Sequence, residues 1–486
     1  MTHSVPLTRG SISKFAPSNI DRFPMAARAP VFDPFTAEVI GEVADCGAIE
    51  VDQVVGEARA AFRRGLPRST RISILEKVAE RLKASEDDFA GLLAMETGKS
   101  LKDCVMEVSR ALETLRYTIA EARTQSTRVI AADAAEAGEG ALAMEMRVPR
   151  GILGAITPFN FPLNTAMHKV APALAVGCAV VLKPAHQAPL TALALERVFR
   201  EAGLPNGWMR VISDSAGQGG AALVSHPDVD VISFTGSNRV GWLIAEAAVK
   251  KKVLLELGSN APVIVTASAA LHHAATRIAT GAFTAAGQSC ISVQRVIVHD
   301  SVADEFEEAL ATATGSLQPG DPFDPSVDVG PLITAEATSR VREWVNDAIV
   351  AGGVLITGDP SSTNVVYPLT IVRDAPVGTK LRDEEVFGPV LTVLRYREFS
   401  EALELANETA FGLQAGVFTG DIDEMMAAFH GLDFGGVLVN DIPTVRLDHQ
   451  PYGGVSESGN TREGPHYAME ELTEIRYLSF RSGAKT

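Results

Sequence analysis

Three residues of this sequence have the side chains that acyl-transfer chemistry requires. Cys290 lies in the stretch TAAGQSCISVQ, Glu256 interrupts the apolar run VLLELGSNAP, and Asn160 lies in ITPFNFPLN. A thiol can act as a nucleophile, a carboxylate whose pKa is raised by apolar surroundings as a general base, and an amide as an oxyanion donor. Their spacing alone does not show that the three residues meet.

Each of these residues also has an ordinary structural interpretation. A cysteine is more often a small buried hydrophobe than a reagent, so Cys290 could be an inert core thiol. Glu256 could be a buried structural carboxylate, and Asn160 could cap the helix that follows it. Residue types alone therefore favour an enzyme but leave the reaction open.

The elements that must position these residues alternate between short apolar strands and helices. Apolar spacing predicts early helices over 50–64, 69–97 and 103–124. Strands are expected at 151–156, 179–182, 209–212 and 229–234, with helices over 163–176, 190–202 and 238–249. A second set runs from 261 to about 435, and 475–480 is expected to be a strand. This alternation predicts two α/β domains with parallel sheets.

Two features interrupt this alternation. Residues 126–147 are small, polar and alternating, which predicts a β-hairpin that projects from the body. The stretch FTGSNRVG follows an apolar strand and opens a helix, where backbone N–H groups can hold a phosphate. Trp242 stands where a P-loop would have its lysine, so a Walker A site is excluded. The stretch GQGGAA at 217–222 is only a weak dinucleotide fingerprint.

The composition excludes several classes of function. A net charge of −17 argues against a nucleic-acid-binding protein, because phosphate backbones require a basic face. We expect no secretory signal in MTHSVPLTRG and no membrane span, because the longest apolar run is interrupted by Pro172 and Gly177. The four scattered cysteines predict neither a disulfide framework nor a metal site, which favours the cytoplasm.

Eight motifs in this sequence make it resemble the aldehyde dehydrogenase superfamily, in its non-phosphorylating, NAD(P)-dependent form. The resemblance runs from about residue 33 to residue 480. In chain order the motifs are TPFNFP, VVLKPA, SFTGS, LELGSNAP, GQSC, EEVFGPV, PYGGVSESG and REG followed by YAMEELTE.

The resemblance implies a fold and a division of the chain. The fold would be α/β and aldehyde dehydrogenase-like, with two Rossmann-like α/β domains plus a small β oligomerisation arm. The implied cofactor-binding domain comprises 1–125 and 148–257, to which 457–472 returns. The implied catalytic domain is 258–456, and the arm comprises 126–147 and 473–486. A homodimer or homotetramer is expected.

The resemblance also implies the reaction. Cys290 would attack an aldehyde to give a thiohemiacetal, whose oxyanion is held by the Asn160 amide and the Cys290 N–H. After oxidation to a thioester, Glu256 would activate the water that releases the carboxylic acid. If coenzyme A took the acyl group instead, the chain would be a CoA-acylating relative. A catalytically silent protein on this fold is the other alternative.

NAD or NADP is the cofactor that the resemblance implies. Lys183 and Glu385 would bind ribose hydroxyls, Ser237 the pyrophosphate, and Phe387 the nicotinamide ribose. The full implied set is Ile156, Pro158, Lys183, His186, Phe234, Thr235, Gly236, Ser237, Leu257, Glu385 and Phe387. Two positions depart from many family members: Phe159 replaces a tryptophan, and His186 replaces a glutamate of NAD-using members. Without that carboxylate, NADP should be accepted.

A small polar or anionic aldehyde is the substrate that this sequence favours. The residues expected to line the aldehyde site are polar: Asn164, Thr165, His168, Ser289, Arg446 and His449. An alkyl chain would leave their donors unpaired, whereas Arg446 could bind a carboxylate or phosphate. The resemblance is nearest to lactaldehyde and glyceraldehyde-3-phosphate types. Alternatively, Arg446 pairs with Asp448 or another acid and does not contact the substrate.

Overall fold

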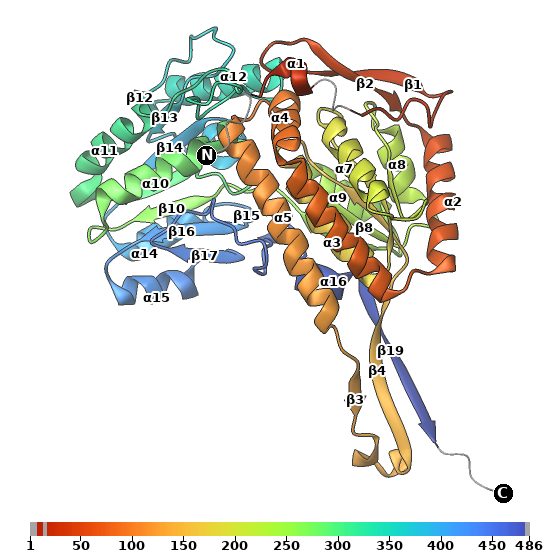
Figure 1. The fold of residues 1–486 in the computed structure, drawn as a ribbon. Coiled ribbons are helices and arrows are strands. Elements are labelled where there is room, and N and C mark those ends of the chain that lie inside the picture. Colours follow the sequence, from red (N-terminus) through yellow and green to blue (C-terminus); the bar gives the residue numbers. More distant parts are fainter. Residues whose placement is uncertain (1–6, 13–16, 482–486) are drawn as a thin grey trace, which may run out of the picture.

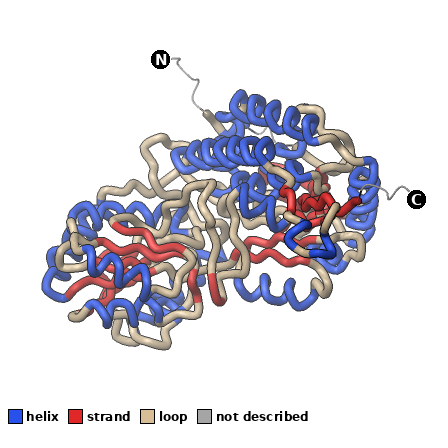
Figure 2. Tube along the Cα trace, turned by 90° about the horizontal axis from the view of Figure 1, so that it is seen from below, coloured by secondary structure: helices blue, strands red, loops and turns tan. Residues whose placement is uncertain are grey.

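The computed structural model describes residues 7–12 and 17–481 as two α/β lobes and a projecting β arm (Figure 1). The predicted α/β class is confirmed by the two large sheets, each flanked by helices (Figure 2). Two expectations fall partly outside the described residues. They are the absence of a secretory signal, for residues 1–6, and the end of the arm, for residues 482–486. The domain boundaries stay a prediction.

The first lobe is built on a five-stranded parallel sheet. Its strand order is β7 (Met209–Val211), β6 (Ala179–Lys183), β5 (Ile152–Ile156), β8 (Val231–Thr235) and β9 (Lys252–Glu256). The crossover helices are α6 (Pro162–Val176), α7 (Pro189–Glu201), α8 (Gln218–Ser225) and α9 (Asn238–Ala247). The strand order reverses at β5, and ligands of such sheets bind outside the strand carboxyl ends at that point.

Further helices and one small ribbon complete this lobe. They are α1 (Arg9–Ile12), α2 (Ala48–Arg64), α3 (Arg68–Ala84), α4 (Glu86–Thr97), α5 (Leu101–Thr124), α16 (Pro465–Glu471), β1 (Ala27–Phe32) and β2 (Val39–Asp45). The expectation of one helix over 69–97 was wrong, because the chain turns at Ser85 between α3 and α4. Three acidic residues, Glu86 to Asp88, occupy the first turn of α4, where the helix dipole favours them.

The second lobe is built on a seven-stranded sheet. Its order is β12 (Val354–Thr357), β13 (Thr370–Arg373), β14 (Val390–Tyr396), β11 (Arg295–His299), β10 (Pro262–Val265), β16 (Gln414–Phe418) and β17 (Gly436–Val439), with only β12 antiparallel. Val263 and Val265 of β10 face one apolar core and Ile264 faces another. The sheet is therefore buried on both faces, as parallel sheets are.

Helices cover both faces of this second sheet. They are α10 (Leu271–Phe283), α11 (Ala303–Gly315), α12 (Ala335–Val350), α13 (Lys380–Asp383), α14 (Phe399–Asn407) and α15 (Ile422–Gly431). β15 (Phe411–Gly412) and β18 (Val455–Ser456) pair with each other as a short antiparallel sheet.

The arm is a three-stranded antiparallel sheet that extends away from both lobes (Figure 1). It consists of β3 (Arg128–Ile130), β4 (Ala141–Pro149) and β19 (Thr473–Arg481), with β4 in the middle. The expected hairpin at 126–147 and the expected strand at 475–480 thus form one sheet. β19 forms one edge of that sheet, and no strand among the described residues pairs with its outer side.

Candidate active site

The topology gathers the candidate residues at one edge of the first sheet. Lys183 and Glu256 are the last residues of β6 and β9, Asn160 lies just after β5, and Ser237 just after β8. Because the four strands are parallel, their carboxyl ends meet at the same edge. Cys290 reaches this edge from the second lobe, in the loop that leads into β11.

A tight left-handed turn positions Cys290. Ala285 and Ala286 have φ values of 52° and 55°, and Gly287 has φ +67°. A Cβ on Gly287 would lie 2.1 Å from the Gly388 carbonyl oxygen, so only glycine fits there. The Cys290 thiol is partly exposed, and its Sγ is 3.2 Å from the Tyr452 Oη. Burial raises the pKa of the Cys290 thiol to about 12, and the Tyr452 hydrogen bond opposes that rise.

Asn160 is held next to the cysteine loop. Its Nδ2 donates to the Gln288 carbonyl oxygen at 2.8 Å, two residues before Cys290. The N-cap of α6 is Phe161, without a side-chain capping bond, so Asn160 is not the helix cap that its position also suggested. An amide nitrogen carries two N–H groups, and the second one is free of the Gln288 contact.

Glu256 is a buried carboxyl group without a hydrogen bond. Its residue is 3% exposed, and neither Oε atom has a partner among the described residues. Burial, and then the charge of Glu463, raise the pKa of Glu256 well above its ordinary value. A Cβ on Gly453 would lie 2.8 Å from Oε1, so a glycine gives this carboxyl group its space. Such a group is suited to act as a general base.

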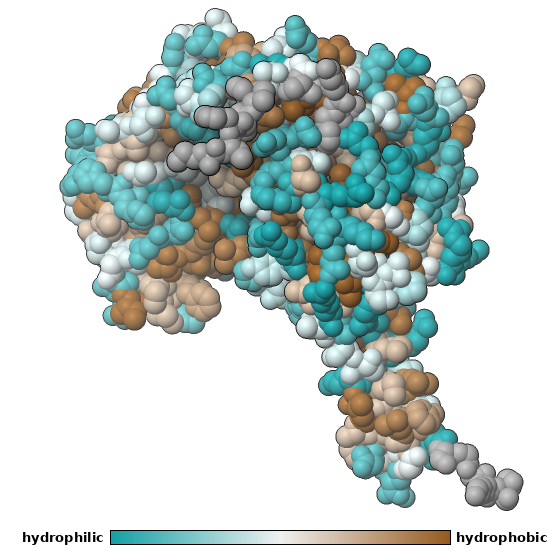
Figure 3. Space-filling view, in the orientation of Figure 1, coloured by the Kyte–Doolittle hydropathy of each residue, from teal (hydrophilic) through white to brown (hydrophobic). Residues whose placement is uncertain are grey.

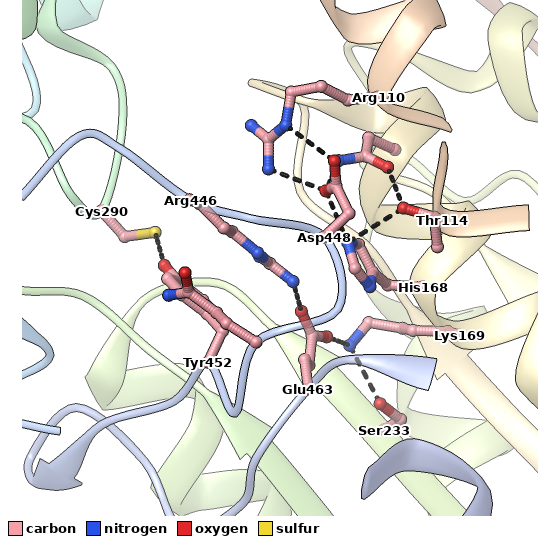
Figure 4. Close-up of polar contacts among 12 residues, drawn as sticks. Arg110, Thr114, His168, Lys169, Ser233, Cys290, Arg446, Asp448, Tyr452 and Glu463 are labelled. Atoms are coloured by element: carbon pink, nitrogen blue, oxygen red, sulfur yellow. Dashed lines mark hydrogen bonds and ion pairs between the residues drawn. The ribbon is translucent and has the colours of Figure 1, made fainter. Parts of the chain in front are cut away.

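Arg446 lies between Tyr452 and an acid that the sequence argument did not single out (Figure 4). Its guanidinium carbon is 3.7 Å from the Tyr452 ring centroid, and its Nη2 donates to Glu463 at 3.0 Å. Glu463 also accepts from Lys169 Nζ at 2.9 Å. The expected alternative, pairing of Arg446 with an acid, is present with Glu463 instead of Asp448. The buried Arg446 Nε has no partner among the described residues.

Asp448 is instead the centre of a second polar cluster (Figure 4). Its carboxylate accepts from Arg110 (2.9 Å), from Asn164 Nδ2 (3.1 Å) and from His168 Nε2 (3.1 Å). Thr114 joins by donating to Asn164 Oδ1 at 2.9 Å. Protein groups already bind the Asn164 amide and Nε2 of His168, so these contacts do not require a polar substrate. The buried Nδ1 of His168 has no partner among the described residues, and contact of either side chain with substrate stays a prediction.

Burial decides the charge states of this cluster. Burial, and then the charge of Arg446, lower the pKa of His168 to about 4, although its contact with Asp448 opposes that shift. Burial raises the pKa of Asp448, but the His168 hydrogen bond and the Arg110 charge outweigh it and hold that pKa below its usual range. At neutral pH the cluster therefore contains a neutral histidine and an ionised aspartate.

The remaining expected substrate residues are scattered around these clusters. Thr165 is half-buried on α6, and Ser289 is buried beside Cys290, where its Oγ accepts from the Ile291 N–H at 3.4 Å. His449 is exposed and its ring lies 4.4 Å from that of Tyr117. Tyr452 and Glu463 were missed as individual residues, although they lie within the motifs PYGG and REG. Asp448 was named only as an alternative partner of Arg446, not as the centre of a cluster.

The expected cofactor residues lie along the same strand ends. Lys183 is half-buried. Burial lowers the pKa of its ammonium group, and the negative charges of Asp214 and Asp45 oppose that shift. Asp214 accepts three backbone N–H bonds around the start of α8. His186 is exposed, and desolvation, then the Lys183 charge, lower the pKa of its imidazole. An exposed imidazole can also face solvent without contacting a cofactor, in which case NAD would still be preferred.

A dinucleotide fits the groups around the start of α9. Ser237 is the N-cap of α9 and makes no side-chain capping bond, and the buried Thr235 Oγ1 has no partner among the described residues. A Cβ on Gly236 would lie 2.5 Å from the Phe234 ring. Ile156 is the last residue of β5 and Leu257 follows β9, and both are buried. Pro158, two residues after β5, is half-buried. Free N–H groups at a helix start suit a pyrophosphate.

Glu385 and Phe387 approach this edge from the loop before β14. Glu385 accepts from the Ser259 N–H at 2.9 Å, and burial raises the pKa of its carboxyl group to about 7. A Cβ on Gly258 would lie 2.4 Å from the Glu385 carboxylate, which explains the glycine. Phe387 has φ 47°, and its ring meets that of Phe159 edge-on at 5.8 Å.

Searches for other kinds of site gave two negative findings. Across 7–12 and 17–481, the side chains form no cluster of histidine, cysteine or acidic residues able to hold a metal ion. None of the helices in the described part of the chain is both long and apolar enough to cross a membrane.

Comparison with known proteins identifies the family. A model of the aldehyde dehydrogenase family matches residues 24–478. The chain is 39% identical over 453 residues to the 3-sulfolactaldehyde dehydrogenase of Priestia aryabhattai, covering 93% of this chain and 95% of that protein.

Two solved structures share the fold at similar identity. One is aldehyde dehydrogenase 21 from Physcomitrella patens, in complex with its reaction product succinate. It has a TM-score of 0.91 and 35% identity, covering 95% of this chain and 96% of that one. The other is glyceraldehyde-3-phosphate dehydrogenase GapN from Methanocaldococcus jannaschii, complexed with NADP. It has a TM-score of 0.89 and 35% identity, covering 93% and 99%. The chain thus belongs to the aldehyde dehydrogenase family and is an NAD(P)-dependent oxidoreductase.

Proposed function

We propose that this enzyme oxidises a small polar or anionic aldehyde to its carboxylic acid through a thiohemiacetal and a thioester on Cys290. The observation that carries the proposal is the arrangement around the thiol. A tyrosine hydroxyl touches Sγ, and a buried guanidinium lies over that tyrosine ring. Only the Tyr452 side chain lies between the positive charge of Arg446 and the Cys290 thiol, and this placement suits a substrate with a negative group.

Each protein group has a role in this sequence of steps. Cys290 Sγ attacks the aldehyde carbon, and the second N–H of Asn160 and the Cys290 backbone N–H stabilise the oxyanion. Glu256, buried and without a hydrogen bond, takes a proton from the water that attacks the thioester. The carboxylic acid leaves, and the thiol is restored.

The residues that would hold NAD or NADP are those at the strand ends. Lys183 and Glu385 would bind ribose hydroxyls, Ser237 and the start of α9 the pyrophosphate, and Phe387 the nicotinamide ribose. When bound, the nicotinamide supplies the hydride acceptor. Since position 186 holds a histidine, NADP should be accepted along with NAD.

The names of similar proteins support an anionic substrate. 3-Sulfolactaldehyde carries a sulfonate, glyceraldehyde 3-phosphate a phosphate, and succinate a second carboxylate. Arg446 is the candidate group that binds this negative charge. Its Nη2 is already paired with Glu463, so the substrate would use the N–H groups that remain, including the unpaired Nε.

Two alternatives remain open to experiment. In a CoA-acylating relative the thioester is transferred to coenzyme A, but Glu256 is present and buried here, which favours hydrolysis. A catalytically silent protein would be expected to lack the nucleophile, and Cys290 is present as a free thiol. We further propose a homodimer or homotetramer built through the arm, in the cytoplasm.

A panel of aldehydes tests the proposed function. Lactaldehyde, succinic semialdehyde and glyceraldehyde 3-phosphate are compared with hexanal and benzaldehyde, each with NAD and with NADP. The product is identified as free acid or acyl-CoA. Arg446→Ala should reduce kcat/KM for the two anionic substrates about tenfold more than it reduces kcat/KM for lactaldehyde, while Arg446→Lys should lose less. Higher kcat/KM on hexanal or benzaldehyde than on all three polar aldehydes would contradict the proposal.

A further inference from the structure

Tyr452 contacts the sulfur atom on which the proposed chemistry depends. Its Oη lies 3.2 Å from Cys290 Sγ, and 162 residues separate the two in the chain (Figure 4). The tyrosine is 3% exposed and packs with Ile291 and Leu413 in a small apolar cluster next to Cys290. Its backbone N–H donates to the Glu463 carbonyl oxygen at 3.2 Å, which fixes the loop that carries the ring.

The direction of this hydrogen bond follows from the chemistry of the two groups. Burial, and then the neighbouring Cys290, raise the pKa of the Tyr452 phenol well above 10, so the phenol keeps its proton. A thiolate has no proton to donate. When Cys290 is ionised, the hydroxyl must therefore be the donor and Sγ the acceptor, in a charge-assisted hydrogen bond.

The surroundings of the Cys290 thiol make the Tyr452 hydroxyl important for its ionisation. Burial opposes ionisation of Cys290, and the negative charges of Glu385 and Glu256 oppose it as well. Two groups favour it: the Tyr452 hydroxyl and the positive charge of Arg446. Arg446 acts partly through the tyrosine, because its guanidinium lies 3.7 Å from the ring centroid and holds the ring in place.

We infer that Tyr452 is a further catalytic residue, whose hydroxyl donates a hydrogen bond to the Cys290 thiolate and so makes the nucleophile available. The inference rests on the proposed function of Cys290. No covalent bond changes in this step: the thiol proton leaves to water, and Tyr452 retains its own proton. Arg446 is then a positioning residue for Tyr452 in addition to its proposed contact with substrate.

Alkylation of Cys290 by iodoacetamide measures thiolate availability without requiring turnover. The rate is followed against pH by mass spectrometry of the Cys290 peptide, in the full-length enzyme with and without NAD. Cys290→Ala gives the background, since Cys46, Cys104 and Cys178 are buried. Tyr452→Phe removes only the hydroxyl. Tyr396→Phe is the matched control, because Tyr396 is 2% exposed and its hydroxyl has no partner among the described residues.

Tyr452→Phe should move the alkylation profile to higher pH by about one unit, which lowers the rate at a fixed pH about tenfold. The kcat/KM profile for aldehyde should move in the same direction. Tyr396→Phe should leave both profiles unchanged. An alkylation profile of Tyr452→Phe that superimposes on that of the wild type, with the same thermal unfolding midpoint, would overturn the inference.

The two proposals fail in different ways. If no aldehyde in the panel is oxidised but the alkylation profile depends on Tyr452, the proposed function fails and the hydrogen bond to Sγ stands. If aldehydes are oxidised and the Tyr452→Phe profiles match those of the wild type, Tyr452 only lines the site.

Discussion

Cys290 differs from the other three cysteines in its surroundings. Cys46, Cys104 and Cys178 are buried, whereas Cys290 is partly exposed at the edge where the two lobes meet. Cys290→Ala should therefore reduce dehydrogenase activity to background, because no other described thiol can replace the nucleophile. Cys104→Ala removes a buried thiol whose hydrogen bond goes to the Lys99 carbonyl oxygen, and this variant should retain activity. Steady-state assays check both, and near-normal turnover by Cys290→Ala would contradict the mechanism.

Glu256 carries a prediction about pH. Because its pKa is raised, the carboxylate form that acts as base becomes populated only as pH rises. Thioester hydrolysis should accordingly accelerate with rising pH in the wild type. Glu256→Gln should release one equivalent of reduced cofactor and then stall, since the thioester forms but is not hydrolysed. Stopped-flow absorbance measures the burst. Full steady-state turnover in Glu256→Gln would show that another group activates water.

His186 carries the prediction about cofactor preference. A glutamate at this position would repel the 2′-phosphate of NADP, so His186→Glu should weaken NADPH binding about tenfold relative to NADH. His186→Gln is the control, since it changes size without adding charge. Dissociation constants from cofactor fluorescence give the comparison. Equal effects of the two substitutions on NADPH would indicate that His186 only faces solvent.

At the scale of elements, the Asp448 cluster joins the loop after β17 to helices α5 and α6. His168 of α6 has a pKa of about 4 in the fold against 6.5 ordinarily, so the unfolded chain binds more protons between these values. Its contribution to stability is complete above pH 6.5 and is lost as pH falls toward 4, by about 3 kcal/mol at most. Asp448 stays ionised in this window, because its own pKa is held low.

Denaturant unfolding at pH 7 and pH 5 measures this contribution. His168→Gln should show a smaller loss of unfolding free energy between the two pH values than the wild type does. His449→Gln, which alters an exposed histidine of the adjoining loop, should retain the wild-type difference. If His168→Gln and the wild type lose the same free energy, the histidine is not the group responsible.

Local patterns predicted these elements better than they predicted their contacts. Strands β5, β6 and β8 and helices α6 and α9 were predicted to within about two residues, because apolar spacing reflects burial directly. The break at Ser85 was missed, although a serine followed by three acidic residues is a recognisable helix start. Side-chain partners such as Asn164 and Asp448 lie far apart in sequence, and no local pattern links them.

The candidate site shows the same division. The resemblance indicated Cys290, Glu256 and Asn160 through short motifs. The parallel strand order then explains why Asn160 after β5 and Glu256 at the end of β9 lie at the same edge of the sheet. It did not indicate that Tyr452 would contact Sγ or that Arg446 would pair with Glu463. Those contacts depend on how the second lobe and the loop after β17 return to the first sheet.

At the scale of the whole molecule, the arm exposes an apolar surface that none of the described residues covers. Figure 3 shows hydrophobic side chains gathered on it. Strand register places one set on a single face of the sheet: Val129, Leu142, Met144, Met146, Leu478 and Phe480. Leu478 is 49% exposed and Phe480 52%. Exposed apolar faces of this kind mark protein–protein contacts, which supports assembly through the arm.

Charge placed on that face should prevent the assembly. The double substitution Leu478→Asp with Phe480→Asp puts two carboxylates where apolar contacts with another copy are expected, so light scattering should report a lower molar mass than for the wild type. Ser479→Asp is the matched control: Ser479 lies between them in β19 but faces the opposite side, opposite Ala143. Its molar mass should equal that of the wild type. Both residues lie on the arm, outside the active site, so the dissociated enzyme should keep the Cys290 alkylation profile. An unchanged molar mass for the double variant would show that the arm's apolar face does not form the interface.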